Sequence, residues 1–296
     1  MASTALKNVF ATMKTTGIVK LLDQHLIRVE NEEDGDRKNE TNSPSGALGC
    51  CRANYYQRMG TKKDPIAPRT RRIFDNGHHV HDRLQTYLED AGVLLMREVP
   101  LYHKGDQIQG HTDGLMDLTG RREEVVILEI KSINDMQYKS LKKAKEDHIA
   151  QGNTYLYCLE EHRLYLRKKY PTKEDFERSA FYRRLKYAQL YKHLKSGNKY
   201  TKAEKIKFKV GQHMQCDEIL YNLKKPINRV IFLYEDKNDQ DLKDFDTTRN
   251  DEVLNEVLAK YRLNNKYFAE KKLPPKECKN KSEGKFCSYL STCFPS

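Results

Sequence analysis

A nearly continuous apolar run, VVILEIK at residues 125–131, limits the fold more than any other part of the sequence. Such a run between charged turns is typical of a central strand that is buried on both faces. Glu129 and Lys131 interrupt it, and because they are two residues apart, both side chains leave the same face of the strand. Burying a carboxylate and an ammonium group there is costly without a purpose. The run therefore predicts a central strand and a candidate site on it.

Shorter patterns around this run predict the remaining elements. Runs of strand length and pattern lie at 94–102, 108–118, 228–234 and 241–245. Runs with helical spacing lie at 50–60, 73–91, 135–159 and 250–270. This order of helix, mixed sheet, helix, strands and helix predicts an α/β domain with helical additions.

Composition and pattern divide the chain into three expected parts. Residues 1–49 combine an amphipathic helical lead-in with a mobile loop that is first acidic and then rich in Ser, Pro and Gly. Residues 50–162 and 226–296 form the α/β core. Residues 163–225 form a basic, aromatic-rich helical insertion into that core.

Positive charge is concentrated in the insertion. Residues 163–209 hold 16 Lys or Arg and 4 Asp or Glu, an excess equal to the net charge of +12 of the whole chain. Nine Tyr or Phe residues are interleaved with them. This pattern suits a phosphate backbone with bases stacked beside it, although a solvated helical face over an aromatic core fits it as well. We expect DNA contacts from the basic side chains Arg167, Lys168, Lys169, Arg183 and Arg184.

The sequence shows no signal for membranes or secretion. No apolar run approaches the roughly 20 residues that span a bilayer, and the first residues, MASTALKNVF, do not have the pattern of a secretory signal. Seven cysteines, an odd number, argue against a disulfide framework. We therefore expect a soluble, cytoplasmic protein with no membrane partner.

Three of the cysteines crowd into the last 19 residues, in CKNKSEGKFCSYLSTC. Several thiolates on short loops can bind one zinc ion or one iron–sulfur cluster, so metal ligation is the natural reason for this crowding.

Ionisable residues on neighbouring elements extend the candidate site. His81 lies on the expected helix at 73–91. Asp113 lies in the segment GHTDGLMDL at 110–118, at or just after a strand. Asp113 and Glu129 together can hold Mg²⁺ or Mn²⁺, and an imidazole ligand shifts the preference towards Mn²⁺. Lys131 can orient or deprotonate a water, or neutralise charge on a phosphodiester. Each residue taken alone has an ordinary structural explanation. The prediction of a metal site therefore rests on the presence of all these residues in this order.

Four short motifs in this order resemble those of the PD-(D/E)xK nuclease superfamily. They are G-x-x-x-H at 77–81, G-x-x-D-G at 110–114, E-x-K at 129–131 and Q-x-x-x-Y at 151–155. The last motif resembles the RecB-type branch. The resemblance runs from about residue 46 to residue 293, apart from the basic insertion. It implies a nuclease core with a mixed central sheet flanked by helices.

The resemblance also implies roles for the site residues. His81, Asp113, Glu129 and the backbone carbonyl of Ile130 would bind Mg²⁺ or Mn²⁺, and Lys131 would be the catalytic lysine. The residues that would position the DNA and this lysine are Gln151 and Tyr155.

Two details depart from the family pattern or compete with it. Thr112 precedes Asp113, where the superfamily name records a proline, and His79 lies two residues before His81. The G-x-x-x-H spacing favours His81 as the ligand and leaves His79 as a surface residue.

The cysteines resemble the iron–sulfur staple of AddB-type and CRISPR-adaptation exonucleases. In that pattern a C-x-R-x-x-Y-Y segment supplies the first thiolate, which selects Cys50, whereas a C-x-x-x-Y-F variant would select Cys51. The resemblance implies Cys278, Cys287 and Cys293 as the partners. Four thiolates suit a 4Fe–4S cluster or a structural Zn²⁺. The resemblance favours the cluster, which would join the N- and C-terminal segments around the core.

These observations predict a metal-dependent DNA nuclease, expected to be an exonuclease on single-stranded or end-processed DNA in recombination, repair or replication. No G-x-x-x-x-G-K-[ST] segment occurs, so unwinding would need a helicase or recombination partner. A small nuclease of this build resembles phage recombination and replication nucleases, which would place it in a host cytoplasm. No sequence signal indicates an oligomeric state. The alternatives are a catalytically silent DNA-binding scaffold and a zinc-stabilised RNA-processing nuclease.

Overall fold

The computed structural model describes residues 17–33, 40–192 and 202–295. The chain forms two compact units. The first comprises Met1–Glu40, Gly49–Val80 and Lys266–Ser296, and the second comprises Thr41–Leu48 and His81–Asn265. Most of the expected lead-in, at 1–16, and part of the expected loop, at 34–39, lie outside the described residues, as do residues 193–201 of the insertion. The expected domain boundaries stay a prediction.

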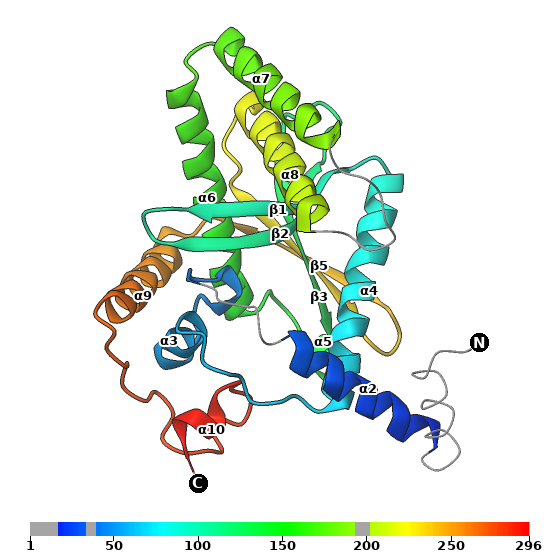
Figure 1. Ribbon diagram of the computed structural model, residues 1–296. Helices are drawn as coiled ribbons and strands as arrows, with labels where there is room; N and C mark the ends of the chain where they lie inside the picture. The colour runs from blue at the N-terminus through cyan, green and yellow to red at the C-terminus, as the bar shows by residue number, and fades with distance from the viewer. Residues whose placement is uncertain (1–16, 34–39, 193–201, 296) are drawn as a thin grey trace, which may run out of the picture. The chain divides into compact units, whose positions relative to one another are not determined.

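The second unit is built on a five-stranded mixed sheet in the order β1-β2-β3-β4-β5 (Figure 1). Its strands are β1 (Leu94–His103), β2 (Ile108–Asp117), β3 (Val125–Ile133), β4 (Arg229–Asp236) and β5 (Leu242–Thr248). β3 and β4 are parallel, and the other neighbouring pairs are antiparallel. β3 lies in the middle, and its first six residues are all buried. The predicted α/β fold with a mixed central sheet is confirmed.

Helices connect β3 to β4 and cover the sheet. The connection contains α5 (Asp135–Ser140), α6 (Glu146–Lys169), α7 (Lys173–Lys192) and α8 (Lys202–Asn222). α6 packs against β1, β3 and β4, and α8 packs against β1 and α6. A short 3₁₀ helix, η2 (Pro44–Gly46), contacts α6 and β2. Two long helices, α4 (Pro68–Asp90) and α9 (Asp251–Ala269), have residues in both units.

The single helix expected at 135–159 is wrong in one respect, because the structure breaks it between α5 and α6. Lys145, the residue before α6, has an extended backbone (ψ 148°), and its N–H donates to the hydroxyl of Tyr234 on β4, 3.2 Å away. This tertiary hydrogen bond takes up the N–H that a continuous helix would need. α6 then continues to Lys169, beyond the expected end of the helix.

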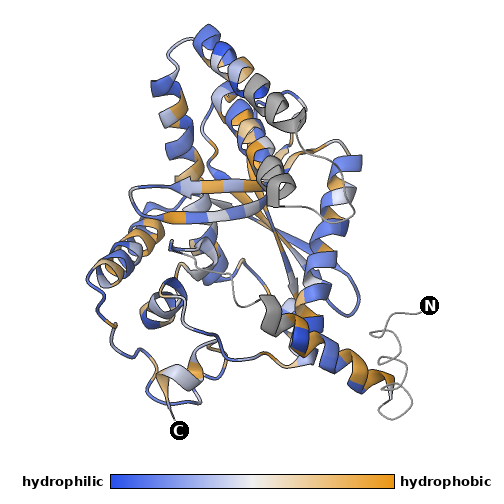
Figure 2. Ribbon diagram, in the orientation of Figure 1, coloured by the Kyte–Doolittle hydropathy of each residue, from blue (hydrophilic) through white to orange (hydrophobic). Residues whose placement is uncertain are grey.

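The core of the second unit lies where the sheet meets α6, α8 and α9. Its fully buried members include Ile127, Ile130, Leu156 and Phe232. Figure 2 shows hydrophobic segments on the strands, whereas α4 is largely hydrophilic. None of the described helices is both long enough and apolar enough to cross a membrane.

Two glycines permit close packing beside the candidate site. A Cβ on Gly152 of α6 would lie 2.7 Å from the Phe232 ring on β4, so the missing side chain lets α6 approach the sheet. A Cβ on Gly114 of β2 would lie 2.6 Å from the Leu94 side chain on β1. Because Gly152 follows Gln151 and Gly114 follows Asp113, both close approaches help to set the positions of site residues.

The first unit brings together early and late segments of the chain. It contains α2 (Ile18–Glu33), α3 (Cys51–Arg58) and α10 (Leu290–Cys293). The Arg52 Nε atom donates to the Pro274 carbonyl at 2.7 Å, and the Asp64 backbone N–H donates to the Ser288 carbonyl at 2.7 Å. These hydrogen bonds join residues more than 200 positions apart along the chain.

Candidate functional site

The predicted acidic pair lies on adjacent antiparallel strands. Asp113 is on β2 and Glu129 is on β3, in the region where Gly114 pairs with Leu128. The Oδ2 atom of Asp113 accepts a hydrogen bond from the backbone N–H of Ile130 at 2.6 Å. This bond fixes the orientation of the Asp113 carboxylate relative to β3.

His81 reaches the acidic pair from α4. Its Nδ1 atom lies 3.1 Å from the Asp113 Oδ1 atom. Gln85, one helical turn later, donates to the Asp113 backbone carbonyl at 2.8 Å, so two side chains join this end of α4 to β2. Burial alone would lower the pKa of His81, but the hydrogen bond and charge of Asp113, together with the charge of Glu129, raise it above its usual value. His79 is exposed, as expected for a surface residue.

Glu129 is 3% exposed and is the most perturbed acid of the site. Its Oε1 atom accepts hydrogen bonds from Lys131 at 2.7 Å and from Gln151 at 2.9 Å. Its Oε2 atom is buried and accepts no hydrogen bond from the described residues. Burial and the charge of Asp113 raise the pKa of Glu129 to about 7, against the opposing effects of Lys131 and Tyr155. The ion pair with Lys131 therefore compensates the charge of the ionised form only in part, because burial and the charge of Asp113 outweigh it.

Lys131 and the Q-x-x-x-Y motif complete this arrangement. The Lys131 ammonium also donates to the Gln151 Oε1 atom at 3.0 Å, and the Gln151 amide donates to the Tyr155 hydroxyl. Gln151 and Tyr155 are four residues apart on α6, so both reach the sheet from the same helix face. Burial, then the charge of Glu129, raises the pKa of Tyr155 well above its usual value and keeps the hydroxyl protonated.

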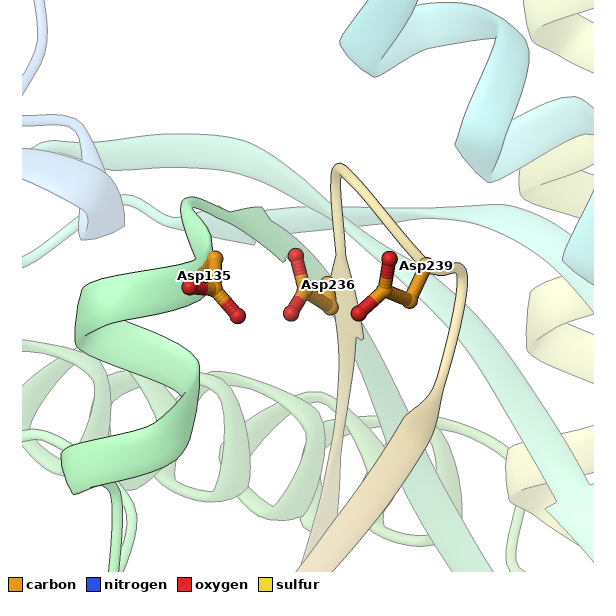
Figure 3. A group of neighbouring side chains, drawn as sticks. All are labelled: Asp135, Asp236 and Asp239. Carbon is orange, nitrogen blue, oxygen red and sulfur yellow. The ribbon is translucent and has the colours of Figure 1, made fainter.

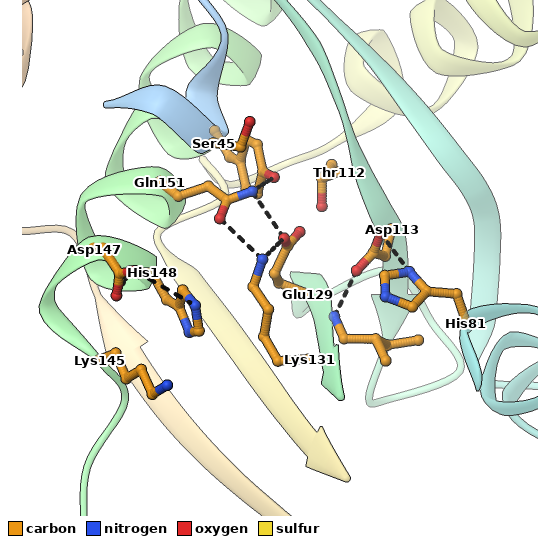
Figure 4. A network of polar contacts seen from close by, with 12 residues as sticks. Ser45, His81, Thr112, Asp113, Glu129, Lys131, Lys145, Asp147, His148 and Gln151 are labelled. Atoms are coloured by element: carbon orange, nitrogen blue, oxygen red, sulfur yellow. Dashed lines mark hydrogen bonds and ion pairs between the residues drawn. The ribbon is translucent and has the colours of Figure 1, made fainter. Parts of the chain in front are cut away.

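The hydrogen bonds therefore bring together all six predicted side chains. Figure 4 shows five of them, His81, Asp113, Glu129, Lys131 and Gln151. We call His81, Asp113, Glu129, Lys131, Gln151 and Tyr155 the polar cluster. Ile130 lies within it through its N–H, and the role of its carbonyl stays a prediction. Thr112 is fully buried, and its hydroxyl donates to the Leu128 carbonyl at 2.8 Å, which explains how a polar residue is accommodated at this position.

Sequence reasoning missed three residues that contact or adjoin the polar cluster. They are Gln85 on α4, His148 on α6 and Tyr234 on β4. His148 precedes Gln151 by three residues, and Tyr234 pairs with Lys131 across the parallel strands. The helical spacing from His148 to Gln151 was visible in the sequence, but the partner Tyr234 lies 86 residues further along the chain.

A separate group of acids gathers where β4 ends and α5 begins (Figure 3). Among the described residues, Asp135, Asp236 and Asp239 form the group of three whose ligand atoms all lie within 4.8 Å of one another. Lys139 forms an ion pair with Asp135 at 2.7 Å, and the Asn238 backbone N–H donates to Asp236 at 2.9 Å. These bonds give partners to two of the three acids, and no sequence motif marked the group.

The four cysteines of the predicted staple lie around one pocket in the first unit. Cys50, Cys278, Cys287 and Cys293 all line it, and we call it the cysteine pocket. The Arg52 guanidinium donates to the Cys293 sulfur at 4.0 Å. Burial, then negative charge on Cys287, raises the pKa of Cys278. Cys51 is buried, and its backbone N–H donates to Glu277 at 2.6 Å.

The basic residues expected to contact DNA are on α6 and α7. Arg183 and Arg184 form ion pairs with Asp217 and Glu218 of α8, and Arg167 donates to the Leu223 carbonyl. Lys168 and Lys169 are exposed at the end of α6. The Lys169 ammonium lies 5.4 Å from the centre of the Tyr165 ring and 5.2 Å from that of Tyr170. DNA contact by these five residues stays a prediction.

Comparisons with known proteins give distant likenesses. No protein-family model and no curated protein matches the chain. Among solved structures, the crystal structure of SSO0001 is similar over 92% of this chain and 95% of that chain, with 13% identity and a TM-score of 0.45. An alkaline exonuclease from Laribacter hongkongensis, LHK-Exo, is similar over 81% of this chain and 97% of that chain, with 15% identity and a TM-score of 0.39. At this distance, the chemistry of the chain rests on its own residues.

Proposed function

We propose that this protein is a metal-dependent DNA nuclease that hydrolyses phosphodiester bonds. The observation that carries the proposal is the buried Glu129 carboxylate, with one oxygen bound to Lys131 and Gln151 and the other left without a hydrogen bond from the described residues. A buried carboxylate oxygen of this kind needs a positive partner. Asp113 and His81 stand close by, so the available donors are two carboxylates and an imidazole.

This donor set fits a divalent cation. Carboxylate oxygens suit Mg²⁺ and Mn²⁺, and the imidazole of His81 adds a preference for Mn²⁺. The residues that would hold the cation are His81, Asp113, Glu129 and the carbonyl of Ile130. A cation bound there would supply Lewis-acid activation of water and charge stabilisation at the phosphodiester.

The chain's own residues have separate tasks in this proposal. The Lys131 ammonium is held between Glu129 and Gln151 and is 21% exposed, so it can reach a phosphate or a water in the site. Gln151 fixes that ammonium by accepting its hydrogen bond, and Tyr155 fixes the Gln151 amide in turn. A lysine that is oriented before the substrate binds loses little freedom in the transition state.

We further propose that the substrate is single-stranded or end-processed DNA and that the action is exonucleolytic. Lys168 and Lys169 are exposed beside the half-exposed ring of Tyr165, a combination that suits a phosphate backbone and a stacked base. A helicase or recombination partner would supply unwinding. A DNA substrate also supports a cytoplasmic location.

For the cysteine pocket we propose a 4Fe–4S cluster bound by Cys50, Cys278, Cys287 and Cys293. Four thiols line one pocket, and Arg52 is placed to donate to a sulfur, as outer residues of metal sites commonly do. The same thiols suit structural Zn²⁺, and iron and acid-labile sulfide content distinguishes the two. The cluster would strengthen the contacts between the residue 50–64 segment and the C-terminal segment.

Digestion of end-labelled DNA tests the nuclease proposal. Anaerobically purified protein is incubated with single- or double-stranded DNA and Mg²⁺ or Mn²⁺, beside Lys131→Ala and the control Lys139→Ala, whose lysine is paired with Asp135 outside the site. We expect metal-dependent cleavage that falls by roughly a thousandfold or more in Lys131→Ala and stays unchanged in the control. Cleavage of neither DNA form by intact, metal-loaded protein would overturn the proposal in favour of a DNA-binding scaffold.

A further inference from the structure

His148 occupies a constrained position beside the polar cluster. It lies in the first turn of α6, and its side chain is 14% exposed. Its Nδ1 atom lies 2.6 Å from the Tyr234 hydroxyl, and the two rings stack with centroids 5.6 Å apart at 28°. Tyr234 in turn is paired with Lys131 across β3 and β4. The residue that holds His148 is therefore Tyr234, the neighbour on β4 of Lys131 on β3.

The hydrogen bonds of Tyr234 determine which nitrogen of His148 carries the proton. The Tyr234 hydroxyl oxygen accepts the backbone N–H of Lys145 at 3.2 Å, and the side chain is fully buried. Its O–H hydrogen has the His148 Nδ1 atom as its acceptor. If Nδ1 carried a hydrogen instead, the buried phenolic hydrogen would have no acceptor among the residues that the structure describes, which costs free energy. The favoured ring therefore accepts at Nδ1 and carries its hydrogen on Nε2.

Among the described residues, the Nε2–H group has no hydrogen-bond acceptor. The Asp147 carboxylate is near it, but the Oδ2 atom is 3.8 Å away, too far for a hydrogen bond. Burial, and then the positive charge of Lys131, lowers the pKa of His148 to about 4, so the ring stays neutral at physiological pH. His148 therefore offers one directed donor and no charge of its own.

The surroundings of this donor suit an anion. His148 and Gln151 are three residues apart and leave the same face of α6, where Gln151 binds Lys131. Figure 4 draws His148 with Lys131 and Lys145, and the Lys145 ammonium also donates to the Gln137 Oε1 atom at 3.2 Å. Both lysines act on the electrostatics of His148 as positive charges. A phosphate group in this place would meet two cations and a neutral N–H donor.

We propose that the Nε2–H group of His148 binds a phosphate oxygen of the DNA strand, at a phosphate next to the one that is cleaved. This inference rests on the proposed nuclease function and adds a strand-binding residue that none of the four motifs contains. Tyr234 acts through His148 and is a positioning residue, because it selects the ring form that can donate to the strand.

Two substitutions separate strand binding from a purely structural role. His148→Asn places an acceptor near the Nδ1 position and can keep the Tyr234 hydrogen bond, but it loses the Nε2–H donor. His148→Gln places an amide near the Nε2 position and can keep a donor towards the strand, but it loses the bond to Tyr234. We expect His148→Asn to weaken DNA binding about tenfold or more, the usual effect of losing a hydrogen bond to a charged group. We expect His148→Gln to weaken it less.

The measurement is the dissociation constant of a fluorescent single-stranded oligonucleotide, with Ca²⁺ in place of Mg²⁺, on the full-length protein. Each phosphate of the oligonucleotide is replaced in turn by an uncharged methylphosphonate. If His148 binds a phosphate, replacement of that one phosphate should weaken binding to the wild type and to His148→Gln. The same replacement should leave binding to His148→Asn unchanged. If His148 has only a structural role, His148→Gln should weaken DNA binding more than His148→Asn does. The losses of affinity should then follow the melting temperatures of the variants and not the position of the replaced phosphate.

Three results would overturn the inference. They are unchanged affinity in a folded His148→Asn variant, a full wild-type response of that variant at every phosphate, and loss of the phosphate response in His148→Gln. Should His148→Asn not fold, the phosphate response of His148→Gln decides the question. Wild-type protein that neither binds nor cleaves DNA would instead remove the nuclease proposal, so the two failures are distinguishable.

Discussion

The polar cluster and the cysteine pocket use different means to bring distant residues together. In the polar cluster, strands β2 and β3 and helices α4 and α6 supply the side chains, and hydrogen bonds connect these side chains to one another. In the cysteine pocket, three of the thiols come from the last segment of the chain, where the regular structure is the short helix α10. One site is therefore placed by long strands and helices, and the other by loops and the ends of two short helices.

This difference predicts how each site would respond to the group that we propose for it. The polar cluster should keep its geometry without a cation, because Gln151, Lys131 and the backbone of Ile130 already orient the carboxylates. The cysteine pocket should depend on its bound group, since structural metal sites contribute folding free energy directly. Substitutions in the two units test this contrast, from the largest expected change in the free energy of unfolding to the smallest.

The largest change is expected at the cysteine pocket, from Cys50→Ser compared with Cys51→Ser. We expect Cys50→Ser to lose iron and acid-labile sulfide and to lower the free energy of unfolding by roughly 3 kcal/mol or more. Cys51→Ser should keep its iron and lose about 1 kcal/mol, as is common for a change at a buried position. Iron content and thermal unfolding of anaerobic protein check this. Loss of iron from Cys51→Ser alone would identify Cys51 as the ligand.

The next change concerns the pH dependence of the metal-free polar cluster. The pKa of Glu129 is raised to about 7 from a usual value of 4.5, so the folded state binds this proton more tightly than the unfolded state does. The stability from this group is fully present below pH 4.5 and is lost as pH rises to about 7. Glu129→Gln should therefore raise the free energy of unfolding by roughly 1–3 kcal/mol at pH 8 and have little effect at pH 5.

Chemical denaturation at the two pH values, in the presence of a chelator, measures this effect. Added Mn²⁺ should stabilise the wild type at pH 8 and leave Glu129→Gln unchanged, because the variant lacks the carboxylate. Equal stabilisation of both proteins by Mn²⁺ would place the bound cation elsewhere.

The smallest changes in the free energy of unfolding are expected at two helical glycines within the sequence motifs, Gly152 on α6 and Gly77 on α4. Gly152→Ala should lower the free energy of unfolding by about 1–3 kcal/mol, because its Cβ would lie 2.7 Å from the Phe232 ring. Gly77→Ala should raise it by about 0.5–1 kcal/mol, because no atom lies within 4 Å of the added methyl group and alanine favours a helix. Urea unfolding curves of both variants test this. Equal effects would show that α6 and β4 are not closely packed at Gly152.

Much of the second unit could be predicted from local patterns. The runs at 94–102, 108–118 and 125–132 correspond closely to β1, β2 and β3, since the alternation and burial of a strand are written in its own residues. The helix over 135–159 was the main error. Its break depends on the N–H of Lys145 donating to Tyr234, a residue far along the chain.

The candidate site shows the same division between local and distant signals. The motif spacing selected all six members of the polar cluster. It missed Gln85 and His148, whose relevance depends on contacts with Asp113 and Tyr234. The charge pattern at 163–209 indicated a basic segment, but not that Arg183 would pair with Asp217. A charge pattern counts residues and does not show which of them face one another.

The amino-acid sequence by itself determined the central strand, the order of the strands and the ionisable and polar side chains that gather in the polar cluster, because periodicity and side-chain type are local properties. The tertiary structure alone decided which oxygen of Glu129 accepts no hydrogen bond from the described residues, which thiols share a pocket and which nitrogen of His148 carries the hydrogen. Each of these depends on the distance between groups that are far apart along the chain. Such distances arise when strands and helices pack, and no local pattern records them.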